Sequence, residues 1–277
     1  MSVYMILTLV LLTAGYCFVQ SITLYTKPIN ESIFKSASLP TDHNSLIGAQ
    51  VLLNANKYGL NHWWDQWFKN QTEKYLNFYG IDEYHIRAPA MEALALAVSL
   101  QTKVYNQSIT GKTSEEALNV TKQLLSSLAY RHKVNTVGGW GNQWESALWS
   151  SHISLGSWLL WNHFNDDDKL LIEKMTIFEA NRFNEYVVPY YQDKTGKVHF
   201  KGDTKAEENA WNANAVQIAL AMMPSHHNLK VWLHKNIELV LSTFARHSDL
   251  SSHEEYHGKQ VSSIFFCLLN FGKFGEK

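Results

Sequence analysis

The sequence predicts an all-α fold in which antiparallel helical hairpins form an (α/α) toroid that is incomplete. Long segments rich in helix-forming residues alternate with short polar turns, so successive helices are expected to be antiparallel neighbours. The pattern contains neither a strand–helix alternation nor a run of strands. Tryptophan and polar residues collect at helix starts, which favours a toroid with a site over a plain bundle. Four hairpins are fewer than a closed toroid normally uses.

The helical segments are marked by their ends as well as by their composition. One contains the good helix formers MEALALAVSL, and the next opens with a serine N-cap followed by two acids. In chain order we expect helices over Ser45–Tyr58, Asp65–Tyr79, Ile86–Tyr105, Ser114–Lys133, Trp140–Trp161, Asp166–Val188, Thr204–Met223 and Asn228–Arg246. The segment Tyr190–Gly202 carries turn residues and is expected to form a loop or a short hairpin.

The ends of the chain differ from its centre in composition. Residues 1–20 are apolar and uncharged, which predicts a signal peptide and a secreted, extracellular protein. A signal anchor is the alternative, because the run approaches the length of a membrane span. After cleavage no stable membrane span is expected. The toroid domain is expected over residues 40–260, and residues 261–277 form an apolar C-terminal tail that no further element follows.

Glycosylation signals agree with passage through the secretory pathway. Four Asn-x-Ser/Thr sequons lie in the first half of the chain, and none has proline at its centre. Their asparagines are Asn30, Asn70, Asn106 and Asn119. These segments are therefore expected at the surface.

The net charge and the cysteine content exclude several kinds of binding site. The net charge is −1 with basic residues spread along the chain, so neither a nucleic-acid surface nor a polybasic membrane patch is indicated. Cys17 lies within the presumed signal peptide and Cys267 is alone, so no intramolecular disulfide and no cysteine metal site are expected. We expect no metal and no cofactor.

The first candidate site is the glycine-rich segment Gly138–Trp161. At 100° per residue, one helical stripe carries an amide, a carboxylate, an indole and an imidazole, namely Asn142, Glu145, Trp149 and His152. Trp140 and Trp144 add indoles that suit stacking on sugar rings. The alternative is structural: polar residues in a first turn satisfy free backbone N–H groups, and a lone histidine is often an interior residue.

The second candidate site is the segment Gly202–Asn214. Thr204 and Glu207 match a capping box, which is a purely structural interpretation. The side chains of Glu208, Trp211 and Asn212 then share one face of a helix that continues into an apolar run. Polar groups at the start of such a buried helix are hydrogen-bonded or functional. We expect the helix starts near Trp140 and Thr204 to open into one hollow edged with indoles and amides.

Two further residues are candidates for substrate binding. Trp63 lies in the compact aromatic cluster NHWWDQW, which suits either a stacking platform or the closure of the barrel end. Arg87 precedes Ala-Pro and suits either a substrate carboxylate or an ordinary ion pair.

The motifs GWGNQWESALW and GDTKAEENAWNAN, followed by MMP-x-HH-x₄-W, give a resemblance between about Arg87 and Gly258. This stretch resembles secreted α/α-toroid polysaccharide lyases of the heparinase, chondroitinase and alginate lyase kind. The resemblance implies β-elimination on a uronic-acid-containing polysaccharide, with Asn142 neutralising the substrate carboxylate and His152 as the base. Those lyases also carry a β-sandwich after the toroid, and this chain stops before one. Their catalytic tyrosine has no clear counterpart; candidates are Tyr190, Tyr191 and Tyr256.

Two other functions fit the same residues. A glycoside hydrolase on an α/α barrel would use two carboxylates that flank the bond, Glu145 or Asp203 together with Glu208. The other is a non-catalytic carbohydrate-binding or inactive homologue, which the missing tyrosine and the early stop of the chain favour. We take Asn142, His152 and Glu208 as the catalytic candidates.

Overall fold

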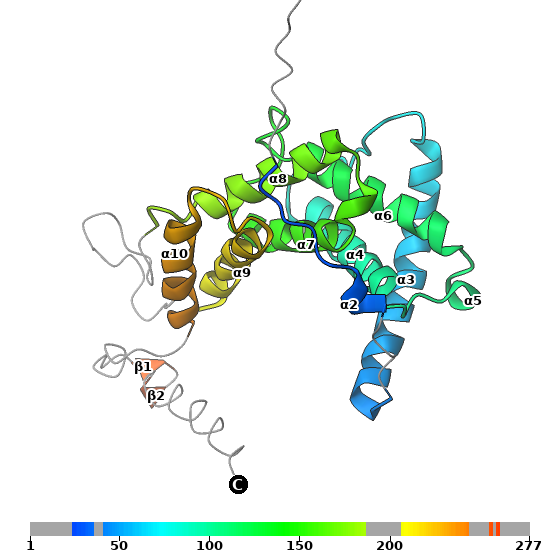
Figure 1. Cartoon of the computed structure of the whole chain (residues 1–277), viewed down its shortest axis with the longest axis horizontal. Helices are drawn as coiled ribbons and strands as arrows, with labels where there is room; N and C mark the ends of the chain where they lie inside the picture. Colours follow the sequence, from blue (N-terminus) through cyan, green and yellow to red (C-terminus); the bar gives the residue numbers. More distant parts are fainter. Residues whose placement is uncertain (1–23, 36–40, 187–205, 244–254, 257–258, 261–277) are drawn as a thin grey trace, which may run out of the picture.

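The computed structural model describes residues 24–35, 41–186, 206–243, 255–256 and 259–260 (Figure 1). The described part is helical apart from a small antiparallel hairpin of β1 (Glu255–Tyr256) and β2 (Lys259–Gln260), so the all-α prediction is confirmed. The predicted signal peptide, the apolar tail and the segment Tyr190–Gly202 lie outside the described residues.

The first long helix, α3 (His43–Lys69), corrects the predicted boundaries. Gly59 does not end a helix there, and the helix expected over Asp65–Tyr79 is wrong, because α3 runs through the glycine and stops at the C-cap Asn70. A glycine inside a helix costs only about 1 kcal/mol. Here it faces α4 closely, since a Cβ at Gly59 would lie 3.5 Å from the Glu92 side chain.

The helices α4 (Glu83–Gln101) and α6 (Ser114–Tyr130) match their predictions within a few residues. Asp82 caps the start of α4. The N-cap of α6 is Thr113 and not the predicted serine, because Thr113 forms a full capping box with Glu116. Short helical turns accompany them as α2 (Ser32–Lys35) and α5 (Gln107–Thr110).

The later helices are shorter than predicted. They are α7 (Ser146–Leu159), the 3₁₀ turn η1 (Trp161–His163), α8 (Asp166–Asn181), α9 (Ala206–Met222) and α10 (Leu229–Leu241). The prediction that a helix starts at Trp140 is wrong, because Gly141 and Asn142 have φ values of 121° and 69°. Residues 140–145 therefore form a loop that leads into α7.

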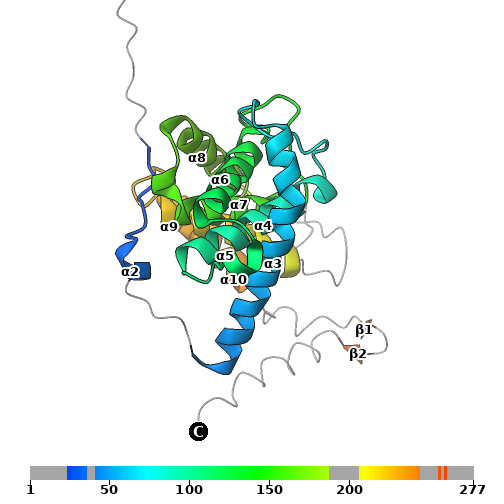
Figure 2. The ribbon, with the colours of Figure 1, turned by 90° about the vertical axis from the view of Figure 1, so that its right-hand side faces the viewer.

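The helices pack in an order that places α4 and α7 at the centre. The helix α3 packs on α4, α4 packs on α6 and α7, and α7 packs on α8 and α9, with α10 against α9. Figure 1 shows α3 and α10 at opposite ends of this arrangement, and Figure 2 shows α3 on one side of α6 with α8 on the other. None of the described helices combines the length and apolar character needed to cross a membrane.

The segment before α2 is tied to the later helices by hydrogen bonds. The buried Glu173 on α8 accepts hydrogen bonds from the backbone N–H groups of Tyr25 and Thr26 and from the Thr26 hydroxyl. The Lys27 N–H donates to the Met222 carbonyl at 2.7 Å. This segment therefore contacts both α8 and α9.

Candidate functional site

One cavity of about 410 Å³ joins the loop before α7, the chain after α8 and the first turns of α9. Its lining residues are Asn142, Trp144, Arg182, Phe183, Tyr186, Glu208 and Asn212. The two segments singled out in the sequence thus open into the same hollow, as expected. The capping role expected for Thr204 lies outside the described residues.

The loop before α7 is held by backbone contacts with the end of α6. The Trp140 N–H donates to the Arg131 carbonyl at 3.1 Å, and the Lys133 N–H donates to the Trp140 carbonyl at 2.7 Å. The Trp140 indole is fully buried and donates to the Leu128 carbonyl at 2.8 Å. Trp140 therefore anchors the loop in the core.

The loop turns through glycine where it passes close to His132, just after the end of α6. A Cβ at Gly141 would lie 2.4 Å from His132 Nε2, a contact that real Cβ atoms do not make. Asn142 follows in the left-handed region, which asparagine tolerates better than most residues. This backbone brings the exposed Asn142 side chain to the cavity.

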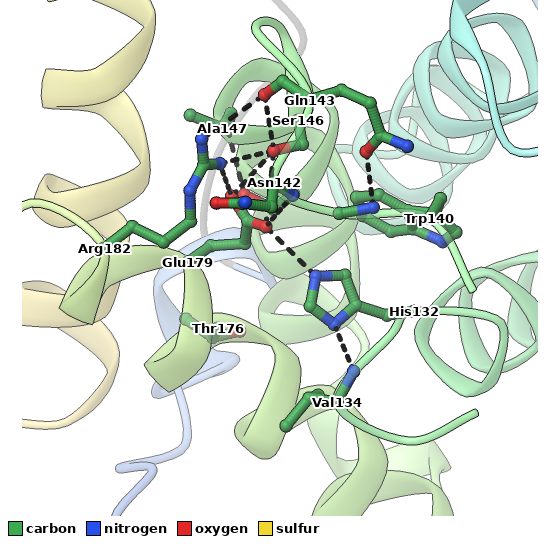
Figure 3. Close-up of polar contacts among 12 residues, drawn as sticks. His132, Val134, Trp140, Asn142, Gln143, Ser146, Ala147, Thr176, Glu179 and Arg182 are labelled. Carbon is green, nitrogen blue, oxygen red and sulfur yellow. Dashed lines mark hydrogen bonds and ion pairs between the residues drawn. The ribbon is translucent and has the colours of Figure 1, made fainter. Parts of the chain in front are cut away.

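Behind the cavity a buried carboxylate collects donors from three segments, as Figure 3 shows. Glu179 accepts from His132 Nε2 at 3.0 Å, from Arg182 Nη1 at 2.5 Å and from the Ser146 hydroxyl at 3.1 Å. The Asn142 N–H lies 3.4 Å from the same carboxylate. Glu179 therefore ties the end of α6, the loop, α7 and α8 together.

The charge state of this network follows from its hydrogen bonds. His132 Nδ1 accepts from the Val134 N–H at 3.2 Å, which leaves the proton on Nε2, where it faces Glu179. Burial by itself raises the pKa of the Glu179 carboxyl, but the hydrogen bond from His132 and the charge of Arg182 outweigh it and hold the pKa below its ordinary value. Glu179 is thus ionised and offsets the Arg182 charge.

Arg182 carries this network to the cavity. Its Nη1 also donates to the Ser146 hydroxyl, and its Nη2 donates to the Gln143 carbonyl at 3.3 Å. The guanidinium has five N–H donors in a fixed fork. Within the described part of the chain, Nε and one Nη2 hydrogen have no acceptor, and these remain for a ligand.

Aromatic side chains form the walls of the cavity. The Trp144 indole is 61% exposed and meets the Trp211 indole edge-on at 5.1 Å between ring centroids. The Phe183 and Tyr186 rings meet edge-on at 5.8 Å. Burial and the nearby Glu208 carboxylate raise the pKa of the Tyr186 phenol, against the charge of Arg182. The phenol therefore keeps its proton at neutral pH.

The structure moves three predicted substrate-binding residues away from the cavity. Trp140 and Trp149 are 0% and 1% exposed and belong to the core, so the expected stacking on sugar is replaced by packing. Glu145 is also buried, where it accepts from the Trp149 indole at 3.3 Å and lies 3.6 Å from Arg87. The predicted helical stripe fails because residues 140–145 are not helical.

The other predicted residues form a separate group on α4 and α7. Arg87 pairs with Glu83 at 2.5 Å, which is the structural alternative. Burial, with a smaller effect of the Arg87 charge, lowers the pKa of His152. Its Nδ1 is buried without a partner among the described residues, and His152 is not among the residues that line the cavity.

Trp63 is likewise a packing residue. It is 6% exposed, and its indole N–H donates to the Glu92 carboxylate. Its ring meets Phe78 edge-on at 5.7 Å. Trp63 is therefore too buried to stack against a sugar, and it does not form the stacking platform that was one of the two roles expected for this cluster.

Sequence reasoning missed the residues contributed by the end of α8. Arg182 and Tyr186 fell within a helix expected to reach Val188, but α8 ends at Asn181 and the chain then turns into the cavity. Glu179 and His132 carried no local signal, because their pairing joins positions 47 residues apart. The one local feature that could have indicated them is the polar and aromatic run RFNEY at residues 182–186, which follows the apolar face of the helix.

The four sequon asparagines all have accessible surface. Asn30, Asn106 and Asn119 are exposed, and Asn70 is partly exposed with its amide nitrogen donating to the Gln66 carbonyl at 2.9 Å. Among the described residues, no group of three or more histidine, cysteine or acidic side chains is arranged to hold a metal ion.

No family model matches this chain, and no curated protein or solved structure matches it. Its function must therefore be argued from the chemistry of the cavity, because a helical fold by itself does not define an activity.

Proposed function

We propose that this chain is a secreted carbohydrate-active protein built as an incomplete (α/α) toroid. Its cavity binds a uronic-acid-containing polysaccharide and cleaves it by β-elimination. One observation carries the proposal: the cavity gathers the Asn142 amide, the Arg182 guanidinium and two proton-exchanging groups, Tyr186 and Glu208, beside exposed indole surface.

The walls of the cavity support sugar binding. A sugar ring presents C–H groups on its faces and hydroxyl groups at its edge. The Trp144 indole, against which the Trp211 ring packs edge-on, offers an apolar surface, while Asn142, Asn212 and Glu208 offer hydrogen-bonding groups at the same cavity. A volume of about 410 Å³ lies within the usual range of small-molecule sites, roughly 300–1,000 Å³.

Neutralising the substrate carboxylate is the central requirement of the reaction, because it acidifies the neighbouring C5 proton. The unused Arg182 N–H donors and the Asn142 amide suit that carboxylate. Glu179 fixes Arg182 from behind, so the guanidinium does not have to be ordered when the substrate binds.

The proton transfers fall to Tyr186 and Glu208 instead of His152. A base takes the C5 proton, a double bond forms between C4 and C5, the C4–O bond breaks, and the leaving oxygen receives a proton. A phenol that keeps its proton at neutral pH is suited to protonating the leaving oxygen, and the Glu208 carboxylate is suited to accepting the C5 proton. Tyr186 thereby supplies the tyrosine for which the sequence offered no clear position.

The hydrolase alternative lacks its second carboxylate within the described cavity lining. Hydrolysis needs two carboxyl groups on either side of the bond. Glu208 is one, whereas Glu145 is buried against Trp149 and Arg87. Asp203 lies outside the described residues.

Incubation with uronic-acid polymers tests the proposal, with the ultraviolet absorbance of the unsaturated product as the readout. We expect Tyr186→Phe and Glu208→Gln each to lower kcat/KM by about 10²- to 10⁴-fold, the usual contribution of a positioned acid or base. Glu207→Gln is the matched control, because this exposed neighbour does not line the cavity.

The other outcomes separate the rival functions. New reducing ends without the absorbance indicate hydrolysis, and binding without either product indicates a non-catalytic carbohydrate-binding protein. Equal activity of Glu208→Gln and Glu207→Gln contradicts the assignment of the cavity as the active site.

A further inference from the structure

A second cavity of about 190 Å³ is lined by Arg131 and by residues of the segments 77–81 and 136–139, the latter just before the loop that leads into α7. The residues that matter in its lining are Asn77, Ile81, Arg131, Thr136, Gly138 and Gly139. Arg131 is the positively charged side chain among its lining residues, and it stands at the C-cap of α6.

The Arg131 guanidinium is oriented but not saturated. Its Nε donates to the Leu76 carbonyl at 3.1 Å, and the group lies 5.5 Å from the centre of the Tyr130 ring. Both contacts fix the plane of the fork. Across the described ranges its terminal Nη groups meet no acceptor, so four N–H donors remain for an anion.

The wall opposite Arg131 is backbone and has little freedom to move. A Cβ at Gly139 would lie 2.2 Å from the Arg131 carbonyl oxygen, so only glycine permits this approach. Gly138 has a φ of 76° and no atom within 4 Å of its Cβ position, which leaves the space beside the loop open. Preformed sites of this kind spend little ordering entropy on binding.

The linings of the two cavities are joined through Gln143, a residue of the loop before α7. Its side-chain amide donates to the carbonyl of Ile81, which lines the second cavity, at 3.2 Å. Its backbone carbonyl accepts from Arg182, which lines the first cavity. A chain of sugars that passes over this loop would therefore meet both cavities in succession.

We propose that the second cavity is an anion subsite, in which the Arg131 fork binds the carboxylate or sulfate group of a neighbouring sugar unit. This inference rests on the proposed function of the first cavity and extends it. The substrate then carries acidic groups on more than one sugar unit. Carboxylate and sulfate groups both suit an arginine fork, because two of their oxygens can accept two parallel hydrogen bonds.

Titration calorimetry with a size-defined oligosaccharide of alternating uronate and sulfated hexosamine tests the subsite. Arg131→Gln is expected to weaken binding by about 10- to 100-fold, as for other charge-assisted hydrogen bonds. Lys133→Gln is the matched control: it removes the same charge from an exposed neighbour that does not line the cavity, and it should change affinity less than about 3-fold.

Two modified oligosaccharides identify the group that is bound. If Arg131 binds sulfate, the wild type and Arg131→Gln should bind the desulfated oligosaccharide with equal affinity. If Arg131 binds carboxylate, the two proteins should instead bind the carboxyl-reduced oligosaccharide with equal affinity. Arg131→Lys keeps the positive charge but lacks the guanidinium fork, so we expect it to bind with intermediate affinity. This variant also tests the subsite if Arg131→Gln does not fold.

The failures of the two proposals are distinguishable. Tight binding by the wild type together with equal affinities of Arg131→Gln and Lys133→Gln overturns the subsite alone. A wild-type protein that binds none of these oligosaccharides overturns the proposed function and the subsite with it.

Discussion

Replacing the buried Glu179 by alanine is the most direct test of how the cavity is held in place. The carboxylate accepts hydrogen bonds from His132, Arg182 and Ser146, and the side chain of Arg182 is only 18% exposed. The substitution strands a guanidinium with little access to water and leaves the buried His132 Nε2–H without its acceptor, whereas the Ser146 hydroxyl keeps the Gln143 carbonyl as an acceptor. Breaking a buried ion pair by removing one partner costs about 3–5 kcal/mol.

Thermal unfolding measures this loss. For a chain of this size, about 1 kcal/mol corresponds to about 2–4 °C, so Glu179→Ala should lower Tm by about 6–20 °C. The exposed Glu185, near the end of the same segment, provides the control, and Glu185→Ala should leave Tm nearly unchanged.

A double variant separates the ion pair from a general packing defect. Replacing both partners of a buried ion pair by apolar residues is often neutral. Glu179→Leu combined with Arg182→Met should therefore be more stable than either single variant. A double variant that loses the sum of the two single losses would refute the pairing.

The same carboxylate gives the wild type a specific acid sensitivity. Because the pKa of Glu179 in the folded protein lies below its unfolded value, its contribution is fully present above about pH 4.5 and is lost as pH falls through the folded pKa. Below pH 4.5, Tm should consequently fall more steeply for the wild type than for Glu179→Ala.

Two further predictions concern the loop and a buried histidine. Gly141→Ala places a Cβ against His132 at a φ of 121°, so this variant should lose about 1–3 kcal/mol of stability in thermal unfolding. The control Gly48→Ala, which lies in open space on α3, should lose none. Equal Tm values of the two variants would contradict the predicted strain at Gly141. Burial, with the neighbouring His227, lowers the pKa of His226 from 6.5 to about 4, so its contribution to stability is lost as pH falls from 6.5 through 4. The decrease in Tm over this range should shrink strongly in His226→Gln and only slightly in His227→Gln, because burial is the larger cause of the shift and the His227 ring is exposed.

Local signals in the sequence were enough to predict most helices. The capping box of Thr113 and Glu116 needs only residues three apart, and the acidic first turn of α8 is equally local. Local signals failed at Gly59, where packing against α4 overrides the weak helix-breaking tendency of glycine. Helix type was thus predictable, whereas boundaries depended on tertiary contacts.

The candidate site was predictable only in part, for a related reason. Asn142, Trp144, Glu208 and Asn212 were found because polar and aromatic residues at two helix starts are conspicuous. Trp140 and Trp149 look the same in sequence, but Trp140 in the loop and Trp149 on α7 are both buried in the core.

The residues at and just after the end of α8 gave no comparably clear signal in the sequence. Arg182 and Tyr186 reach the cavity because α8 ends five residues before Tyr186, and Glu179 acquires its role from donors in three other segments. A pairing of this kind becomes visible only when the chain is folded.

Backbone with positive φ is concentrated in one short segment beside the cavity. Gly138, Gly141 and Asn142 have positive φ within five residues, and the only non-glycine among them, Asn142, lies directly at the cavity. A buried ionic network stabilises a fold no better than well-packed apolar residues of similar volume. Stability alone therefore does not explain why Glu179 holds both the Asn142 backbone and the Arg182 guanidinium. The role that we propose for Glu179 is to position those two groups at the rim of the cavity, where the surroundings hold Asn142 in its left-handed backbone conformation.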